Sequence, residues 1–359
     1  MRDVTIAGRP IGPAHPPYVI AEMSGNHNGD ISRAFAIMEA CKEAGADAVK
    51  LQTYTADTIT IDHDGPGFTM EGGLWDGRTL YDLYTEAHTP WDWHEDLFAK
   101  GRELGITVFS SPFDPTAIDL LASLDAPAYK IASFEIVDLP LIEYAAKTGK
   151  PLVISSGMAS LGDMADAVAA ARGAGTGGVV LLHCVSGYPT PFGDMNLKTI
   201  PNLAAAFDVV PGLSDHSMGV AASVAAVALG ACVIEKHVTL RRADGGPDAD
   251  FSLEPDELAD LVQSVNAAHD ALGDVVYGPV ASEATELDVR RSLYAVTDIE
   301  AGNLLTGENV RSIRPGFGLA PKHLPRVLDR RARRYIAKGT PLTWDLIDDT
   351  ETAGGNDND

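Results

Sequence analysis

The sequence predicts a (β/α)8 TIM barrel followed by a small β-rich domain, and three observations support this fold class. Short apolar runs of strand length recur about eight times over roughly 270 residues, each followed by a helix-like stretch. Apolar strands that alternate with helices form a parallel sheet covered on both faces, and eight such units match a closed barrel. The turn at residues 22–29 lacks the Gly-x-Gly-x-x-Gly fingerprint of a doubly wound sheet. The alternation stops after Gly273.

The expected strands are apolar runs that end in polar residues. The last two, residues 209–216 and 231–237, flank a small-residue segment of helical length at residues 217–230. Two strands joined by a crossover helix lie parallel, so their carboxyl ends share one edge of the barrel. The other expected strands cover residues 18–23, 48–52, 107–112, 128–135, 151–157 and 179–186.

The chain divides by pattern into a large and a small part. We expect a catalytic barrel over residues 1–275, a linker over 276–290 and a β-rich module over 291–350. The polar, glycine-rich residues 351–359 are expected to be disordered. The longest insertion into the barrel pattern, residues 53–92, is long enough to be a lid or a binding loop. Most of its aromatic side chains are expected to pack against the barrel, and one or two to form a substrate wall.

Composition and charge exclude several classes of partner. The formal net charge is -24, and so acidic a chain repels nucleic acid and anionic membranes. No apolar run approaches membrane-span length and the first residues show no signal-peptide pattern, so a cytoplasmic location is expected. Cys41, Cys184 and Cys232 have no disulfide or metal spacing and are expected to be buried thiols. A phosphorylated substrate would need local cations to offset the acidic field.

Polar and charged side chains gather where the expected strands end, which is where barrel enzymes hold their active sites. His216 and His237 end two of these strands, and two converging imidazoles can hold a divalent metal. Lys50 and Lys130 lie in apolar runs, so each ammonium must reach water or meet an anion. A single polar residue at a strand end is as easily explained by exposure to solvent. Polar residues at the ends of so many strands favour a site for a small dianion beside a metal. The rim also carries Glu22, Ser111, Ser133, Glu135, Ser155, Ser186 and Ser214.

Several short motifs carry a resemblance to a known family. They are Lys130-Ile-Ala-Ser-Phe-Glu135, Ser155-Ser-Gly-Met, Tyr188-Pro-Thr-Pro, Ser214-Asp-His216, Glu235-Lys-His237 and Gly245-Gly-Pro-Asp248. In combination they resemble the sialic-acid synthase family, whose members condense phosphoenolpyruvate with an amino-sugar aldehyde. Residues 310–318 are similar to the antifreeze-like (SAF) domain of that family. The resemblance covers residues 20–348.

The resemblance implies roles for individual residues. Phosphoenolpyruvate would bind Lys50, Ser111, Lys130, Ser133, Ser155, Ser186 and Ser214. A divalent metal, Mn²⁺ or Mg²⁺, would lie on His216 and His237. Glu22, with Glu135 as the second candidate, would steer the attacking water, and the sugar would contact Gln52, Tyr188 and Asp248. Arg314 of the partner subunit would also reach the sugar, which implies a domain-swapped homodimer.

Within the family, the pseudaminic acid synthases are the most similar members. These transferases condense phosphoenolpyruvate with 2,4-diacetamido-2,4,6-trideoxy-L-altrose and release phosphate. Ser186 stands where N-acetylneuraminate synthases have Asn, and Phe134 where they tend to have Gly. N-acetylneuraminate or legionaminic acid synthesis, another aldehyde substrate, and a non-enzymatic sugar-binding barrel with an interaction-type tail are the alternatives. The similarity to the pseudaminic acid synthases rests on residues 52–57, 72–76, 86–91, 110–114 and 251–255.

Overall fold

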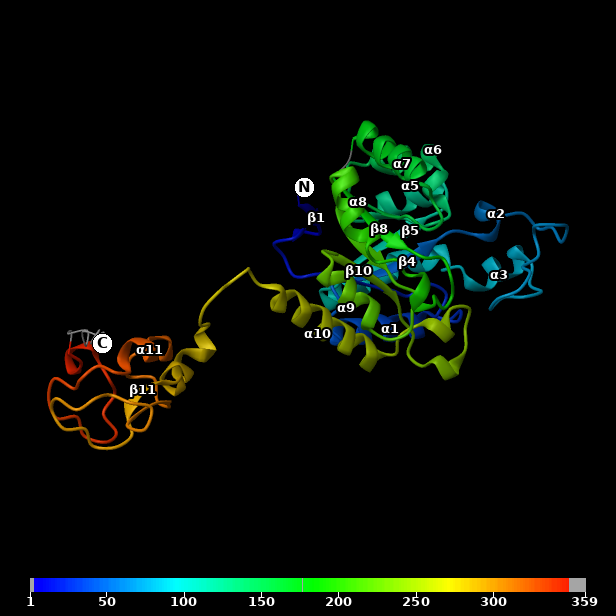
Figure 1. Cartoon of the computed structure of the whole chain (residues 1–359). Coiled ribbons are helices and arrows are strands. Elements are labelled where there is room, and N and C mark those ends of the chain that lie inside the picture. The colour runs from blue at the N-terminus through cyan, green and yellow to red at the C-terminus, as the bar shows by residue number, and fades with distance from the viewer. Residues whose placement is uncertain (1–2, 176, 349–359) are drawn as a thin grey trace. The chain divides into compact units, whose positions relative to one another are not determined.

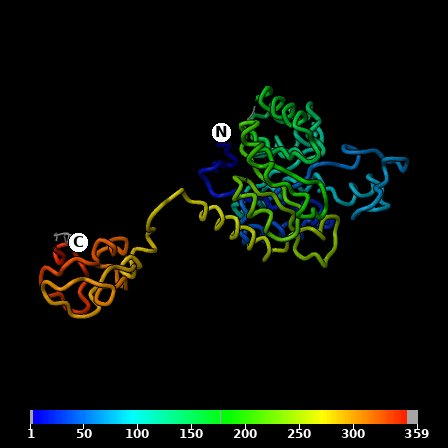
Figure 2. The backbone as a smooth tube through the Cα atoms, viewed as in Figure 1, coloured from blue at the N-terminus to red at the C-terminus, as the bar shows by residue number. Residues whose placement is uncertain are grey.

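The computed structural model describes residues 3–175 and 177–348. The chain forms two compact units, Met1–Gly273 and Asp274–Asp359 (Figures 1 and 2). The first unit ends where the strand and helix alternation of the sequence stops. The expectation of disorder at residues 351–359 concerns a segment that lies outside the described residues.

The first unit is a closed barrel of eight parallel strands, which confirms the predicted fold class. Each strand pairs in parallel with the next along the chain, and β10 pairs with both β9 and β3 to close the ring. The strands are β3 Tyr18–Glu22, β4 Ala48–Thr53, β5 Thr107–Pro112, β6 Tyr129–Ile131, β7 Leu152–Ser155, β8 Val179–Cys184, β9 Val210–Ser214 and β10 Val233–His237.

Four strands end two or more residues earlier than their apolar runs suggested. The expected strand at residues 128–135 stops at Ile131, and a 3-10 helix, η2 Glu135–Val137, follows it. The expected strand at residues 151–157 stops at Ser155, just before the left-handed Gly157. The third and fourth, at residues 179–186 and 209–216, stop at the ends of β8 and β9. The polar residues just beyond these ends leave the barrel ladder, which frees their side chains for the rim.

Helices cover the outside of the barrel, and side-chain caps begin most of the longer ones. Asp30, Asp114 and Asp138 each accept a backbone N–H at a helix start, and Ser160 forms a capping box. Their apolar faces pack on the strands in one continuous outer core. These helices are α1 Ile31–Glu43, α4 His94–Leu104, α5 Pro115–Ser123, α6 Leu139–Ala146, α7 Leu161–Ala174, α8 Thr199–Phe207, α9 Ala221–Ala228 and α10 Pro255–Leu272.

A short antiparallel hairpin, β1 Val4–Ile6 and β2 Arg9–Ile11, closes the amino-terminal end of the barrel. Val4, Ile6 and Ile11 are buried in one cluster with side chains from the barrel lumen, including Phe109. The hairpin and the insertion after β4 lie at opposite ends of this unit (Figure 1). Among the described residues, the hairpin covers the lumen at this end, and the main pocket lies at the end where the strands finish.

The insertion at residues 53–92 is not a structureless loop. It contains α2 Ala56–Ile59, α3 Leu80–Ala87 and a 3-10 turn, η1 Trp91–Trp93. Together, α2 and α3 stand out from the barrel on one side (Figure 1). The Trp91 indole donates to the carbonyl of Tyr54, which ties the end of the insertion back to its start.

The second unit has its own apolar core and little regular structure. Its strands, β11 Ser292–Ala295 and β12 Val310–Ile313, pair antiparallel. The expected linker at residues 276–290 contains a 3-10 helix, η6 Ala281–Val289, whose side chains are exposed. Its other elements are η7 Pro321–His323, α11 Leu324–Val327 and η8 Trp344–Leu346. No helix in the described parts of either unit has the length and apolarity to cross a membrane.

Candidate active site

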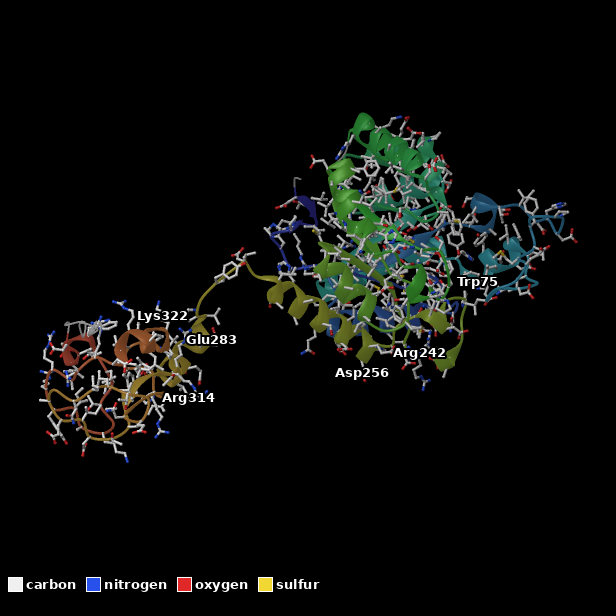
Figure 3. The ribbon with its side chains drawn as sticks, in the orientation of Figure 1. Trp75, Arg242, Asp256, Glu283, Arg314 and Lys322 are labelled. Carbon is white, nitrogen blue, oxygen red and sulfur yellow. The ribbon has the colours of Figure 1, made fainter. Side chains whose placement is uncertain are left out.

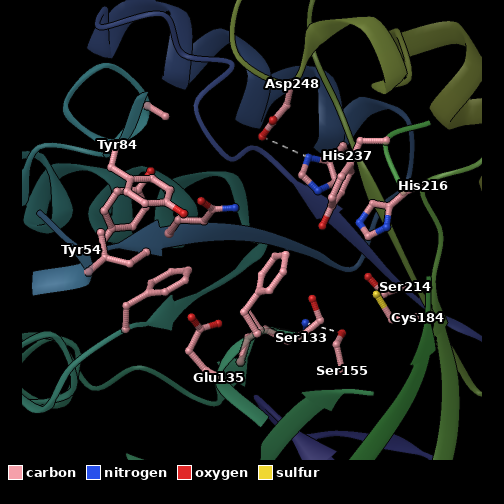
Figure 4. Close-up of a pocket in the computed structure, with 18 of the residues that line it drawn as sticks. Tyr54, Tyr84, Ser133, Glu135, Ser155, Cys184, Ser214, His216, His237 and Asp248 are labelled. Atoms are coloured by element: carbon pink, nitrogen blue, oxygen red, sulfur yellow. Dashed lines mark hydrogen bonds and ion pairs between the residues drawn. The ribbon is translucent and has the colours of Figure 1, made fainter. Parts of the chain in front are cut away.

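A pocket of about 390 Å³ opens at the carboxyl ends of the barrel strands. Side chains from six strands line it: Lys50 and Gln52 of β4, Lys130 of β6, Ser155 of β7, Cys184 of β8, Ser214 of β9, and Glu235 and His237 of β10. Because side chains alternate along a strand, one face of each strand end points into the lumen. Figure 4 shows how these side chains converge from different strands.

The floor of the pocket holds two lysines and two glutamates that are almost fully buried. Lys50 Nζ lies 2.6 Å from Glu22 Oε2 and 3.5 Å from Glu235 Oε1. Lys130 Nζ lies 3.4 Å from the same Glu235 oxygen. The sequence required each ammonium to reach water or meet an anion, and here both meet carboxylates. We call these four side chains the floor cluster.

Burial and mutual charge set the protonation of the floor cluster. Burial raises the pKa of Glu22 to about 7, although Lys50 opposes the shift. Burial would also raise the pKa of Glu235, but Lys130 and Lys50 together outweigh it and lower that pKa. Burial lowers the pKa of Lys130, and the charge of Glu235 opposes this shift. Because the raised pKa of Glu22 reduces its negative charge near neutral pH, the floor is locally cationic inside an acidic protein.

Serine hydroxyls surround the floor cluster. Lys50 Nζ donates to Ser111 Oγ at 3.3 Å, and Lys130 Nζ donates to Ser155 Oγ at 2.6 Å. Ser214 donates to Glu235 Oε1 at 3.1 Å. Ser133 and Ser186, on two adjacent rim segments, share a hydrogen bond of 2.9 Å. These hydroxyls and ammonium groups are the donors that a phosphate or a carboxylate recruits.

His216 and His237 face each other at the rim, with ring centroids 5.3 Å apart. The Nδ1 atom of His216 pairs with the carbonyl of Val185 at 3.0 Å, which leaves its Nε2 to face other groups. Within the described residues, His237 Nδ1 has no hydrogen-bond partner although it is buried. Burial, followed by the charges of His216 and the lysines, lowers the pKa of His237 well below its ordinary value.

This donor set fits a divalent cation that the two imidazoles would hold. A ring nitrogen anchored on a backbone carbonyl and a buried orphan nitrogen on the facing ring are features of metal-binding histidines. Among the residues that the structure describes, no group of three or more His, Cys, Asp or Glu side chains could hold a metal. The remaining ligands would therefore have to be substrate oxygens or water.

A buried ion pair supports the two histidine-bearing strands from outside the lumen. Lys236 Nζ lies 2.9 Å from Asp215 Oδ2, and neither side chain is accessible to solvent. Asp215 also accepts hydrogen bonds from Ser217 and Ser223. Because Lys236 alternates with His237, the pair joins β9 and β10 behind the pocket. Its role is to position strands.

The loop after β10 brings Asp248 to the pocket. Its Oδ2 lies 3.6 Å from His237 Nδ1 and accepts a short hydrogen bond from Ser24. Ser24 is buried and left-handed, with φ 43°, a conformation that is strained for a residue with a side chain. The Trp75 indole of the insertion donates to the carbonyl of Pro247 at 2.9 Å (Figure 3). Two loops from opposite parts of the barrel sequence thus meet beside Asp248.

Glu135 is the pocket carboxyl that no other side chain pairs. Its Oε2 atom is buried and has no hydrogen-bond partner among the described residues. Burial raises the pKa of Glu135 to about 7, and the charge of Lys130 opposes this shift while that of Asp138 adds to it. A carboxyl with a pKa near neutrality can both take up and release a proton under physiological conditions.

Aromatic and aliphatic side chains form the opposite side of the pocket. The Tyr54 ring contacts Phe113 and Tyr84 edge to face, with centroids 5.1 and 5.7 Å apart. Figure 4 shows Tyr54 and Tyr84 across the pocket from Ser214 and His216. We call a set of apolar residues of the lining the apolar wall; its members are Tyr54, Ile59, Met70, Leu83, Tyr84, Ala87, Phe113 and, on the rim between Ser133 and Glu135, Phe134.

The structure brings most of the predicted site residues to this pocket and places others behind it. The lining includes Lys50, Gln52, Lys130, Ser133, Glu135, Ser155, Tyr188, Ser214, His216, His237 and Asp248. Three more lie one contact behind it: Glu22 and Ser111 touch Lys50, and Ser186 touches Ser133. Arg314 belongs to the second unit (Figure 3).

Sequence reasoning missed several lining residues. Glu235 lies two residues before His237 in β10, so the strand pattern already placed both side chains on the same, lumen-facing side. Cys184 is buried, as expected of a structural thiol, yet it also lines the pocket. The aromatic residues of the insertion that line the pocket are Tyr54, Trp75 and Tyr84. No local signal distinguished them from the aromatic residues that only pack.

Comparisons with known proteins agree with this site. The chain matches the NeuB family over residues 37–277 and the SAF domain over residues 290–348. It is 42% identical over 335 residues to the pseudaminic acid synthase of Helicobacter pylori, covering 93% of this chain and 98% of that protein. It is 43% identical over 328 residues to the pseudaminic acid synthase of Campylobacter jejuni, covering 90% and 95%.

A solved structure shows the same architecture. The N-acetylneuraminic acid synthetase of Leptospira borgpetersenii, in complex with citrate, superposes with a TM-score of 0.71 and 32% identity, over 80% of this chain and 95% of that one. The match includes the barrel that carries the pocket, and the relatives extend it along nearly the whole sequence. The resemblance drawn from the motifs is therefore confirmed, and the chain belongs to the NeuB family.

Proposed function

We propose that this protein is a pseudaminic acid synthase, which condenses phosphoenolpyruvate with 2,4-diacetamido-2,4,6-trideoxy-L-altrose and releases phosphate. The observation that carries the proposal is the convergence of two buried lysines and two imidazoles on one pocket. The identities of 42% and 43% to pseudaminic acid synthases support the choice of sugar.

Phosphoenolpyruvate would occupy the floor of the pocket. Its phosphate and carboxylate require several positive or hydrogen-bonding donors, and Lys50 and Lys130 with their serine partners supply them. In a protein of net charge -24, this locally cationic floor is what makes binding of such an anion favourable. Binding would replace the contacts of the lysines with Glu235 by contacts with the substrate.

A divalent cation, Mn²⁺ or Mg²⁺, held by His216 and His237 would act as a Lewis acid toward the sugar aldehyde. The anchoring of His216 on the carbonyl of Val185 fixes the ring for that task. Asp248, held by Ser24, would restrain His237 and contact the sugar. Gln52 and Tyr188 line the same region and would hold sugar oxygens.

The reaction forms one C–C bond and one C–O bond, the latter from water, and breaks the C–O bond to phosphate. The electron pair of the C2=C3 bond of phosphoenolpyruvate attacks the aldehyde carbon, and the aldehyde oxygen takes a proton to become a hydroxyl. Water adds to the electron-poor C2, the bond between C2 and the phosphate oxygen then breaks, and the proton of the new C2 hydroxyl leaves with the phosphate, which yields a 2-keto acid and inorganic phosphate. Glu135, with a pKa of about 7, would accept the proton of the water and return it to the sugar oxygen. Glu22 would act through Lys50, since it lies behind the pocket wall.

We also propose a domain-swapped homodimer in which Arg314 of the partner subunit contacts the sugar. The resemblance to the family and the match of the SAF domain support this assembly. In a mixture of Arg314→Ala and Glu22→Ala chains, some sites regain both residues and turnover is partly restored. A mixture no more active than its components would show that each site is built by one chain.

The test of the function is a substrate panel with purified protein. Phosphoenolpyruvate and Mn²⁺ are mixed with 2,4-diacetamido-2,4,6-trideoxy-L-altrose, with its legionaminic-type isomer and with N-acetylmannosamine. Phosphate release and the product mass are then measured. We expect the altrose derivative to give the highest kcat/KM. A higher value for either other sugar would assign the enzyme to that branch, and no phosphate release with any sugar would refute the synthase function.

A further inference from the structure

The pocket has two chemically different sides, and the reaction uses only one of them. The polar side carries Lys50, Lys130 and the two imidazoles, where the reacting carbons and the phosphate belong. The other side is the apolar wall, where the rings of Tyr54 and Phe113 lie in contact. Figure 4 shows the two sides facing each other across the pocket. A ligand that fills the pocket must be polar at one end and apolar at the other.

The apolar wall is built for contact with a ligand. Helix α3 places Leu83, Tyr84 and Ala87 in the pocket lining, because residues one turn apart share a helix face. Ile59, the last residue of α2, adds an aliphatic side chain to the same wall. The insertion thus contributes apolar surface instead of the polar groups that usually line a sugar site.

Phe134 is the most exposed member of the wall. Its side chain is 59% accessible although it lines the pocket, and it stands between Ser133 and Glu135 on the rim. A large exposed aromatic residue contributes little to the fold of the described chain. At the mouth of a pocket it offers instead a surface that a bound ligand can cover.

The open-chain sugar determines which of its atoms reach this wall. Its aldehyde carbon must lie on the polar side, beside the imidazoles and the floor cluster. Carbon 6 is at the other end of a chain that spans roughly 6 Å, from C–C bonds of about 1.5 Å. A methyl group there would be buried favourably against the wall, whereas a hydroxymethyl group would lose hydrogen bonds to water without replacement.

We propose that the apolar wall, and Phe134 in particular, makes the enzyme select acetamido sugars that end in a methyl group over those that end in a hydroxymethyl group. This inference rests on the proposed function and assigns its sugar specificity to residues outside the reacting centre. Phe134 is a specificity residue here and takes no part in bond making.

The experiment compares two sugars that differ only at carbon 6. These are 2,4-diacetamido-2,4,6-trideoxy-L-altrose and the corresponding sugar that keeps its 6-hydroxyl group. The kcat/KM ratio of the pair is measured by phosphate release at saturating phosphoenolpyruvate. Discrimination between such groups is on the order of 10- to 100-fold, and we expect the parent enzyme to favour the 6-deoxy sugar in this range. Phe134→Ser should lower the ratio about tenfold, with the KM for phosphoenolpyruvate unchanged, and Phe134→Leu should keep it.

Phe192 provides a matched control. It is also 59% exposed and lies in η3 Phe192–Asp194, outside the pocket lining. Phe192→Ser should leave the ratio as in the parent. A parent that turns over both sugars equally, or a Phe134→Ser ratio equal to that of Phe192→Ser, would overturn this inference and leave the synthase function intact. No phosphate release with either sugar would refute the pseudaminic acid synthase function, and the inference would fall with it.

Discussion

The unpaired carboxyl of Glu135 makes a prediction about stability and pH. Folding raises its pKa from 4.5 to about 7, mainly through burial. Below pH 4.5 the group is protonated in the folded and unfolded states and costs nothing. As the pH rises from 4.5 through 7, the unfolded chain ionises this group first, and the folded protein must then hold a buried charge. The free energy of unfolding of the parent therefore decreases over this pH range. Glu135→Gln removes this titration and should become more favourable relative to the parent as the pH increases.

The size of the effect follows from the two pKa values. With 1.36 kcal/mol for each pKa unit, the full shift corresponds to about 3 kcal/mol of destabilisation, of which about 1 kcal/mol is present at pH 5 and nearly all at pH 8. The stability of Glu135→Gln relative to the parent should thus increase by up to about 2 kcal/mol between these pH values. Because the side chain is partly accessible, solvent screening reduces this to about 1–2 kcal/mol.

Urea unfolding at pH 5 and pH 8, followed by tryptophan fluorescence, measures the difference directly. Glu43→Gln, on the exposed end of α1, is the control and should give the same difference at both pH values. If Glu135→Gln also gives a difference that does not change with pH, Glu135 does not hold a buried charge. The proton transfer assigned to it would then lose its physical basis.

Three further predictions concern the floor, the supporting ion pair and the histidines. Lys130→Met should weaken phosphoenolpyruvate binding by about 10- to 100-fold in calorimetry, the range for a lost hydrogen bond to a charged group, while the exposed Lys198→Met should not. Lys236→Met should lower the free energy of unfolding by about 3–5 kcal/mol, because it leaves Asp215 buried without its cation. The double variant Lys236→Met with Asp215→Asn should recover part of this lost stability. His237→Ala should abolish Mn²⁺ binding measured by electron spin resonance with the circular dichroism spectrum unchanged; unaltered Mn²⁺ affinity would refute the assignment of the metal ligand.

The barrel was predictable because its signal is local. Each strand is an apolar run, and each following helix begins with a cap or shows a clear apolar face. The ends of the strands were less certain, since β6 stops at Ile131 although the apolar pattern continues. Polar residues at the rim leave the hydrogen-bonded strand when their side chains bond to another segment, as the Ser133 hydroxyl does with that of Ser186. Such partners are set by the tertiary structure.

The polar side of the site was predictable for the same reason, and the apolar wall was not. The polar ends of the expected strands placed Lys50, Lys130 and the two histidines at one rim of the barrel. The wall depends on how the insertion folds back over the pocket, and an aromatic residue such as Tyr84 carries no mark in the sequence of which surface it will cover. Strand position also overstates access to the ligand. Glu22 ends a strand and points inward, but Lys50 lies between its carboxylate and the pocket.

The hairpin at the foot of the barrel has a kinetic consequence. Because Ile6 and Ile11 fill that end with apolar side chains, the pocket in the described barrel is closed at its base and ligands enter from the opposite end. Of two reactants that share it, the one seated deeper must enter before the other and cannot depart past it. Under the proposed chemistry, phosphoenolpyruvate would arrive first and the sugar second, and steady-state patterns would show an obligatory sequence of addition.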